Sequence, residues 1–440
     1  MDHTTCCVVG GGPAGVMTGY LLARAGVNVK VLEKHGDFFR DFRGDTVHPS
    51  TLEVFSELGL LNDLLKVPHQ KISFGGGVFG DTEFKLADFR YLPVCCPFVA
   101  LMPQWDFLDF LSSRARQFPN FSLEMQHEAT DLLWDQDLVI GVSAKTPAGI
   151  KTIQADLVIG CDGRHSTVRR CAGFQVIDTG VPIDVLWFRL SRKSNDSEQL
   201  LGRVNYGKAL ILINRGDYFQ AGLVIRKNSF DQLKDAGLPR LRELLTHIAP
   251  FLGERVEEIQ DWDQVKLLSV QINHLRRWYR PGLLCIGDAA HAMSPGGGVG
   301  INLAIQDAIA AARILGGALR EHRSTDALLP RVQRRREFPA LVTQAVQKRA
   351  HAGLAYVFDH AGPMRAPLQF RLITRIPGVQ RLLGRLIGIG VRPEHVRPQR
   401  PNPVLLAVLF GAGAGLVVRG LRYLAGPKRK PALRPKASPC

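Results

Sequence analysis

Residues 6–15 read Cys-Cys-Val-Val-Gly-Gly-Gly-Pro-Ala-Gly, and this stretch decides the fold. Its first four residues are apolar, which is typical of a buried parallel strand, and we expect one over residues 6–10. A helix over residues 14–25 and a second strand over residues 27–32 should follow. A strand, a glycine-rich turn, a helix and another strand in this order predict a Rossmann-type dinucleotide-binding unit.

The glycines of this turn suit a pyrophosphate. Gly10 allows the tight turn after the strand, Gly12 lets the backbone approach the phosphates, and Gly15 lets the helix pack closely on the strand. Pro13 and Ala14 begin the helix, whose N-terminal N–H groups and positive dipole end favour phosphate. The turn by itself leaves open whether the nucleotide is FAD or NAD.

An acidic residue ends the second strand. Glu33 lies 23 residues after Gly10, where a carboxylate can accept hydrogen bonds from both ribose hydroxyls. The same charge would repel a 2′-phosphate, so the nucleotide held here should not be NADP. We expect the neighbouring Lys34 at the same nucleotide.

Two more hydrophobic strands run into glycine–aspartate turns. Residues 155–160 lead to Asp162-Gly163, and residues 282–286 lead to Gly287-Asp288. A loop with four glycines, residues 295–302, comes next and opens an alanine-rich helix from Leu303.

With these three motifs in order, the chain resembles the class A flavoprotein monooxygenases, the fold family of 4-hydroxybenzoate hydroxylase, over residues 5–320. The resemblance implies an α/β fold in which a Rossmann-type FAD-binding domain is interleaved with a mostly antiparallel β-sheet substrate domain. FAD-binding parts are expected at 1–180, with substrate-side insertions around 70–100, and at 276–325, with the substrate domain at 181–275. A helical, basic C-terminal extension at 326–425 and a disordered tail at 426–440 complete the expected order.

The resemblance also implies contacts to the cofactor. Asp288 would bind the ribityl chain, and Asp162-Gly163 would serve both FAD and NAD(P)H. The 295–302 loop would meet the flavin pyrimidine edge, where helix amides offset the charge of the reduced ring and three consecutive glycines permit movement. The cofactor-binding residues expected on these grounds are Gly10, Gly12, Pro13, Ala14, Gly15, Glu33, Lys34, Arg43, Gln104, Asp162, Gly163, Asp288, Pro295, Gly298, Gly300, Ile301 and Asn302.

The activity that the resemblance implies is that of a monooxygenase fed by NADPH or NADH. Reduced FAD would react with O2 to give a C4a-hydroperoxide, which hydroxylates or epoxidises an electron-rich, lipophilic or aromatic small molecule. One alternative is an FAD-dependent reductase or dehydrogenase of the same fold acting on an isoprenoid or quinone-type substrate, and another is a flavin-binding protein without turnover. Because the flavin supplies the reactive group, no catalytic side chain has a fixed place, and the candidates are His48, Arg189, Tyr206, Arg215 and Tyr218.

The region between the second and third motifs should form the substrate sheet. We expect strands over 185–190, 209–214, 220–225 and 264–270, and a helix over 237–252. Leu212 and Asn214 align with the positions that clamp a carboxylate in benzoate hydroxylases. Because neither is Ser or Arg, we expect a substrate that is larger or less charged than a simple benzoate. The alternative is that another segment binds the substrate.

The C-terminal quarter carries the excess positive charge. Residues 331–440 hold 21 of the 56 Lys and Arg residues and only three acidic residues, so their net charge is +18 and that of residues 1–330 is −2. Short helices over 369–375 and 378–389 have apolar faces, and residues 404–418 carry no charge. This run is shorter than the about 20 residues of a spanning helix. We therefore expect peripheral contact with an anionic membrane; a spanning helix, or a helix docked on protein, is the alternative.

The cysteines indicate a reducing compartment. The eight cysteines form no CxxC pair, and no histidine stands at metal-ligand spacing from them. We expect buried, reduced thiols in a cytoplasmic protein that needs neither a metal nor a nucleic acid, and no signal peptide is recognisable before the first strand.

Overall fold

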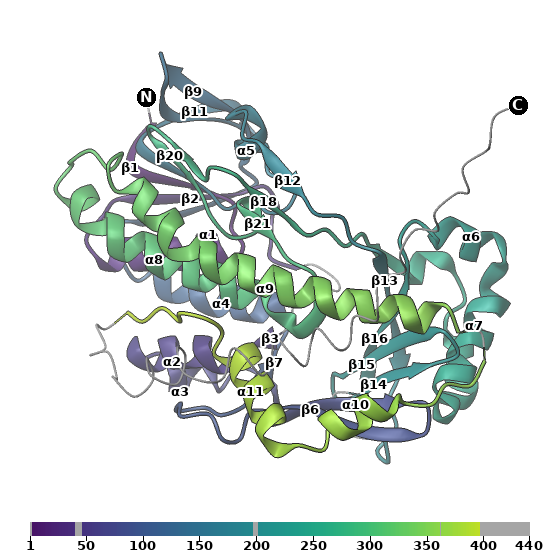
Figure 1. Ribbon diagram of the computed structural model, residues 1–440. Coiled ribbons are helices and arrows are strands. Elements are labelled where there is room, and N and C mark those ends of the chain that lie inside the picture. The colour runs from purple at the N-terminus through teal and green to yellow at the C-terminus, as the bar shows by residue number, and fades with distance from the viewer. Residues whose placement is uncertain (1, 40–45, 197–200, 361, 397–440) are drawn as a thin grey trace, which may run out of the picture. The chain divides into compact units, whose positions relative to one another are not determined.

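The computed structural model describes residues 2–39, 46–196, 201–360 and 362–396 (Figure 1). Residues up to Val396 form one compact unit, so the described helices beyond residue 326 belong to the same body as the nucleotide-binding unit. Arg43, the uncharged run 404–418 and the tail 426–440 lie outside the described residues.

The nucleotide-binding layer is a sheet with the strand order β19-β20-β11-β1-β2-β8. Pairing from β20 through to β8 is parallel, which confirms that the three motif strands β1, β11 and β20 lie side by side. The strands of this sheet are β1 (Asp2–Val9), β2 (Val29–Glu33), β8 (Phe121–Met125), β9 (Glu128–Asp135), β10 (Leu138–Thr146), β11 (Gly149–Gly160), β19 (Tyr279–Arg280) and β20 (Leu283–Cys285).

Helices cover this sheet and share its core. The predicted first helix is α1 (Pro13–Arg24), and the alanine-rich helix α8 (Gly300–Arg320) begins three residues earlier than expected. Among the described helices, only α8 with the turn before it is long and apolar enough to span a membrane. Its core-facing residues are buried in this unit. The remaining helices here are α2 (Pro49–Glu57), α3 (Leu61–Leu64), α4 (Gln104–Ala115) and α5 (Thr167–Cys171).

The substrate sheet has the strand order β17-β13-β16-β15-β14-β5-β6. It is antiparallel except for the parallel pair of β14 with β5, so the expected insertion around 70–100 supplies two of its strands. The strands are β5 (Phe74–Phe79), β6 (Thr82–Asp88), β13 (Ile183–Ser191), β14 (Leu201–Asn205), β15 (Lys208–Asn214), β16 (Tyr218–Arg226) and β17 (Lys266–Leu268). The predicted strand 264–270 is therefore shorter than expected, and β14 was not predicted.

The two faces of the substrate sheet pack differently. Leu210 and Leu212 pack with Leu245 of α7 (Gly237–Ile248) in one apolar cluster. Ala209 and Ile213 belong to a second cluster on the opposite face, with Trp187 of β13. The alignment of Leu212 with a substrate clamp is therefore wrong, because side chains alternate along a strand and a one-residue shift exchanges the faces.

A small sheet of order β3-β7-β4 connects the two large ones. Its strands are β3 (Thr46–Val47), β4 (Gln70–Ile72) and β7 (Val99–Leu101). Val47 and Ala100 pack into the nucleotide-binding core, whereas Ile72 and Leu101 pack against the Trp187 face of the substrate sheet. The Trp187 face is therefore the one turned toward the nucleotide-binding layer.

The longest helix, α9 (Leu329–Phe358), lies in the C-terminal region that was expected to be helical, although its bounds were not predicted. It runs along the nucleotide-binding layer and reaches the substrate sheet, and α10 (Leu368–Ile373) and α11 (Pro377–Gly388) follow it (Figure 1). The predicted helix 237–252 ends at Ile248 and continues as the 3-10 helix Pro250–Glu258, because a proline follows directly. Other short elements are α6 (Phe230–Asp235), β12 (Val176–Asp178), β18 (Asn273–Leu275), β21 (His291–Ala292) and the 3-10 turns Trp262–Gln264, Gly287–Ala289 and Gly296–Gly298.

The prediction that the cysteine thiols are buried holds for most of them but not for all. All seven described cysteines are free, and five of them are buried. Cys95 is exposed and Cys171 is half-buried, because the first lies in the loop after β6 and the second ends α5 at the surface.

Candidate functional site

The first glycine turn is shaped for close approach. Gly10 has a φ of +106°, and an added Cβ would lie 2.5 Å from the Cys161 carbonyl oxygen. A Cβ on Gly15 would lie 1.8 Å from the Gly10 carbonyl oxygen, so the helix packs directly under the turn. At Gly12, the N-cap of α1, no described atom lies within 4 Å of that position. The turn is therefore tightly packed against the protein at Gly10 and Gly15 but open at Gly12, next to the helix N-terminus, where a phosphate would bind.

Glu33 lies at this turn. Its Oε2 accepts a hydrogen bond from the Gly11 amide at 3.0 Å, and its Oε1 accepts one from the His35 amide at 3.1 Å. The parallel pairing of β1 with β2 brings the carboxylate there. Lys34 is exposed beside it.

The second motif forms a helix cap. Asp162 Oδ2 accepts a hydrogen bond from the Val168 amide at 3.0 Å, and Gly163 turns the chain with a φ of +82°. Asp162 Oδ1 is buried and has no hydrogen-bond partner among the described residues. Burial raises the pKa of this carboxyl, although hydrogen bonds at the start of α5 oppose the shift. The geometry makes Asp162 a capping residue of α5 at the junction with the first motif.

The third motif touches both of the others. Arg164 Nη2 lies 3.7 Å from Asp288 Oδ2, and Arg169 Nη1 donates to the Ala289 carbonyl at 3.5 Å. A Cβ on Gly287 would lie 3.2 Å from the Cβ of Ala14 at the start of α1. Three segments far apart in sequence thus meet at the carboxyl ends of parallel strands, where ligands bind in open α/β sheets.

The glycine-rich loop after β21 is held at its far end by Asn302. The Asn302 side chain accepts from the His48 amide at 2.8 Å and donates to the Gly298 carbonyl at 3.2 Å. Thr46 Oγ1 also donates to the Gly298 carbonyl, at 2.7 Å. The Asn302 side chain therefore stabilises the loop. The backbone amides of Gly300 and Ile301, in the first turn of α8, are the groups that could bind a ligand.

A buried ionic cluster beneath the third motif was missed from the sequence. Asp307 Oδ2 accepts from the Gly287 amide at 3.0 Å and lies 2.5 Å from His291 Nε2. Arg336 Nε donates to Asp307 Oδ1 at 2.8 Å, and Glu394 lies 3.6 Å beyond Arg336. Burial by itself would raise the pKa of Asp307, but His291 and Arg336 outweigh it and lower the pKa. The only signal in the sequence was His291 directly after the motif.

The predicted catalytic candidates divide into three places. Arg189, Arg215 and Tyr218 lie together at one end of the substrate sheet, where the Arg189 guanidinium stacks 4.8 Å from the Tyr218 ring and Arg215 Nη2 donates to Gln220 Oε1 at 3.1 Å. Tyr206 stacks on His247 of α7, on the face away from the motifs. His48 is buried beside the glycine-rich loop, with Nδ1 2.8 Å from the Ile387 carbonyl oxygen of α11.

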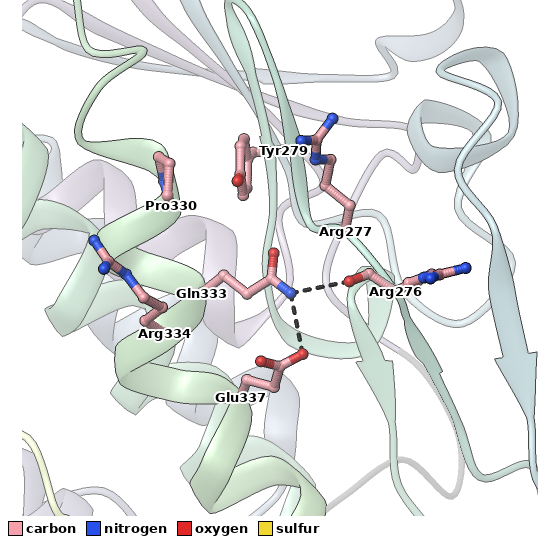
Figure 2. Close-up of a pocket in the computed structure, with 7 residues that line it drawn as sticks. All are labelled: Arg276, Arg277, Tyr279, Pro330, Gln333, Arg334 and Glu337. Carbon is pink, nitrogen blue, oxygen red and sulfur yellow. Dashed lines mark hydrogen bonds between the residues drawn. The ribbon is translucent and has the colours of Figure 1, made fainter.

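Two further residues complete the site. Gln104 begins α4 and is half-buried, two residues after the β7 strand that pairs with β3. Trp187 lies against Gly222 on the inner face of the substrate sheet, and its buried Nε1 has no hydrogen-bond partner among the described residues. A surface hollow of about 450 Å³ lies elsewhere, between the β18–β19 loop and α9, and none of its lining residues belongs to the three motifs (Figure 2).

The sequence pattern of the FAD binding domain family matches residues 3–346. The chain belongs to this FAD-binding family. The glycine turn, the open N-terminus of α1 and the carboxylate of Glu33 fit the ADP half of FAD. This flavoprotein is an FAD-dependent oxidoreductase of the class A flavin monooxygenase type.

Relatives of the flavoprotein are named as monooxygenases of aromatic compounds. A 6-methylpretetramide 4-monooxygenase of Streptomyces rimosus is 31% identical over 394 residues, which cover 87% of this chain and 92% of the relative. A para-nitrophenol 4-monooxygenase of Pseudomonas sp. strain WBC-3 is 25% identical and covers 73% of this chain and 80% of its own. 

Solved structures share the fold of the flavoprotein. PqsL of P. aeruginosa in complex with 2-aminobenzoylacetate superposes with a TM-score of 0.70 at 21% identity, covering 81% of this chain and 97% of that one. OxyS anhydrotetracycline hydroxylase from Streptomyces rimosus has a TM-score of 0.70 at 24% identity, covering 91% and 78%.

Proposed function

We propose that the flavoprotein uses NADPH or NADH and O2 to hydroxylate an aromatic small molecule. The observation that carries the proposal is that three motifs meet at the carboxyl ends of neighbouring parallel strands, where Arg164 lies beside Asp288. An apolar face of the substrate sheet lies opposite. When bound there, FAD would supply electron transfer from the nicotinamide and activation of O2 at its C4a atom.

Named residues would hold the cofactor. The amides of Gly12, Ala14 and Gly15 would bind the pyrophosphate. Glu33 would bind the ribose hydroxyls, and Asp288 the ribityl hydroxyls. We also assign Lys34, Arg43, Gln104 and the Asp162-Gly163 turn to the cofactor, in keeping with their predicted roles. The segment that contains Pro295, Gly298, Gly300, Ile301 and Asn302 would face the pyrimidine edge of the flavin, through the amides of its last three residues.

The chain's own part in the reaction would be exclusion of water and orientation of the substrate. The inner face of the substrate sheet combines Val185, Trp187 and Val224 with the apolar side chains of β4 and β7. This lining fits an aromatic ring rather than a small carboxylate. The Trp187 indole N–H, buried without a partner among the described residues, would donate to a phenol or carbonyl oxygen of the substrate.

We further propose that the face of α10 and α11 contacts an anionic membrane surface. Four large apolar side chains there are about half exposed or more: Leu368, Leu372, Ile376 and Leu382. Between residues 362 and 396 the chain has six arginines, and the only acid, Glu394, is buried and paired with Arg313. Charge complementarity therefore favours anionic lipid over the basic C-terminal segment or a second copy of the chain.

Purification and turnover test the proposed activity. The protein should release FAD on denaturation, and an aromatic compound such as 6-methylpretetramide should accelerate NAD(P)H oxidation with one O2 consumed for each product formed. Full-speed turnover without O2 would instead identify a reductase or dehydrogenase. Bound NAD without flavin would rule out the proposal.

A further inference from the structure

One face of α9 carries a row of buried polar side chains. The row consists of Gln333, Arg336, Gln344, Gln347 and His351, each less than a tenth exposed. From first to last it spans 18 residues, or five turns and about 27 Å. Each member bonds to the chain between residues 273 and 307. On the face of α9 turned toward the flavoprotein core, the three glutamines therefore clamp backbone groups, whereas Arg336 and His351 bond to the side chains of Asp307 and Ser294.

The first clamp, at Gln333, shows the pattern. Its Oε1 accepts from the Trp278 amide at 3.0 Å, and its Nε2 donates to the Arg276 carbonyl at 3.1 Å and to Glu337 (Figure 2). One amide thus holds a loop from both sides, since it satisfies a backbone donor and a backbone acceptor together.

Gln347 holds the start of the glycine-rich loop in the same way. Its Oε1 accepts from the Ser294 amide at 3.1 Å, and its Nε2 donates to the Ser294 and Gly296 carbonyls, each at 2.9 Å. These contacts lie on both sides of Pro295, which has no N–H of its own.

His351 adds a contact at the same place. Its Nε2 lies 2.9 Å from Ser294 Oγ, which also accepts from the Gly296 amide at 3.2 Å. Burial lowers the pKa of His351, which favours the neutral ring. α9 therefore holds residues 294–296 through four hydrogen bonds from two side chains.

The loop is consequently anchored at both ends. Thr46 and Asn302 bind the Gly298 carbonyl, and Gln347 and His351 hold the segment before it. Three consecutive glycines would otherwise sample many backbone conformations. Seven residues after His351, at the end of α9, Phe358 lies in the apolar cluster on the inner face of the substrate sheet, so one helix connects that sheet with the loop.

We propose that Gln347 and His351 are positioning residues of the flavin site. They fix residues 294–296 so that the amides around Gly300 keep one orientation toward the pyrimidine edge of the flavin. The proposal rests on the proposed contact between this loop and FAD. Loss of either clamp should leave the amides misplaced, so that reduced flavin is less stabilised and oxygen escapes as hydrogen peroxide.

A matched pair of variants tests it. Gln347→Leu and Gln333→Leu remove the same side chain from the same helix, and each frees backbone groups of one loop, but only the first loop belongs to the proposed flavin site. For Gln347→Leu we expect a several-fold rise in hydrogen peroxide formed per NAD(P)H oxidised and a more negative flavin midpoint potential. Gln333→Leu should match the wild type in both. Equal values for the two variants would overturn the proposal.

The contact between His351 and Ser294 gives an independent test that needs smaller changes of side chain. His351→Leu should uncouple turnover, and His351→Gln should restore coupling because its amide can still bond Ser294 Oγ. The effects of Ser294→Ala and His351→Leu should be less than additive, because both changes remove the same bond. No rescue by Gln, or additive effects, would contradict the proposal. Failure of the proposed function is a different result: the wild type itself would hold no FAD or would not consume O2 with NAD(P)H.

Discussion

Arg164 Nη2 lies 3.7 Å from Asp288 Oδ2, a contact that joins the second motif to the third. The two side chains are 21% and 31% exposed, so the ion pair is screened by water and contributes little stability. Its value is geometric, because it places a guanidinium and a carboxylate at the carboxyl ends of neighbouring parallel strands. The Asp288 carboxylate remains within reach of a ligand hydroxyl.

Asp288→Ala should weaken FAD binding. Hydrogen bonds from ribityl hydroxyls to a carboxylate would be lost, at a cost of about 1–3 kcal/mol, or roughly tenfold or more in affinity. Flavin content after dialysis and the dissociation constant for FAD measure this. Asp178→Ala, which changes an exposed acid on β12, is the control and should keep its flavin. Equal flavin retention in both variants would show that the motif has been misassigned.

His48 should make stability depend on pH. Burial lowers its pKa from 6.5 to about 4, against the opposing effect of the Ile387 and Gly297 carbonyls. His48 therefore binds a proton near pH 6.5 in the unfolded chain, but only near pH 4 in the folded chain. The free energy of unfolding falls by about 3 kcal/mol as the pH drops from 6.5 to about 4. His48→Asn keeps a donor for Ile387 and does not titrate, so urea unfolding should show a shallower loss. Identical pH profiles for the two proteins would count against the burial of a neutral ring.

Trp187→Phe should separate stability from substrate binding. Because the indole N–H is buried without a described partner, its removal should leave the melting temperature of the ligand-free protein unchanged or higher. KM for an oxygen-bearing aromatic substrate should rise about tenfold, the equivalent of one hydrogen bond. Trp278→Phe removes a second buried, unpartnered indole N–H from the nucleotide-binding core and should leave KM alone. An unchanged KM in Trp187→Phe would remove this residue from the substrate site.

Membrane contact should depend on the α10–α11 face. Full-length protein should pellet with vesicles that contain anionic lipid, more weakly at high salt, since each arginine near such a surface adds up to about 1 kcal/mol. The double change Leu372→Ser and Ile376→Ser should reduce binding several-fold. Ile150→Ser alters an equally exposed apolar residue on the β10–β11 hairpin and should not. Pelleting that ignores both lipid charge and these changes would point to a protein partner instead.

The sequence predicted the parts of the site that are local. A strand, its glycine turn and the following helix are encoded within about 25 residues, and the three motifs were recognised in that form. The parallel strand order then brings them together, so Gly10, Asp162 and Asp288 follow neighbouring strands, while their contacts with FAD stay predictions.

The parts that were missed depend on distant partners. The polar row on α9 has no signal in the sequence, because its buried Gln, Arg and His side chains bond to groups that lie 29 to 71 residues earlier in the chain. Arg336 was counted only within the net charge of residues 331–440, yet it is buried and paired with Asp307 and Glu394. Leu212 was assigned to the wrong face because an alignment by one residue decides which side of a strand points inward.

Incorporation of oxygen from isotopically labelled O2 tests the central claim most directly. The flavoprotein, with NAD(P)H and an aromatic acceptor such as 6-methylpretetramide, should form a product that contains one labelled oxygen atom, and mass spectrometry would detect it. Product that carries oxygen only from water, or that forms equally well without O2, would contradict the assignment of this chain as a monooxygenase.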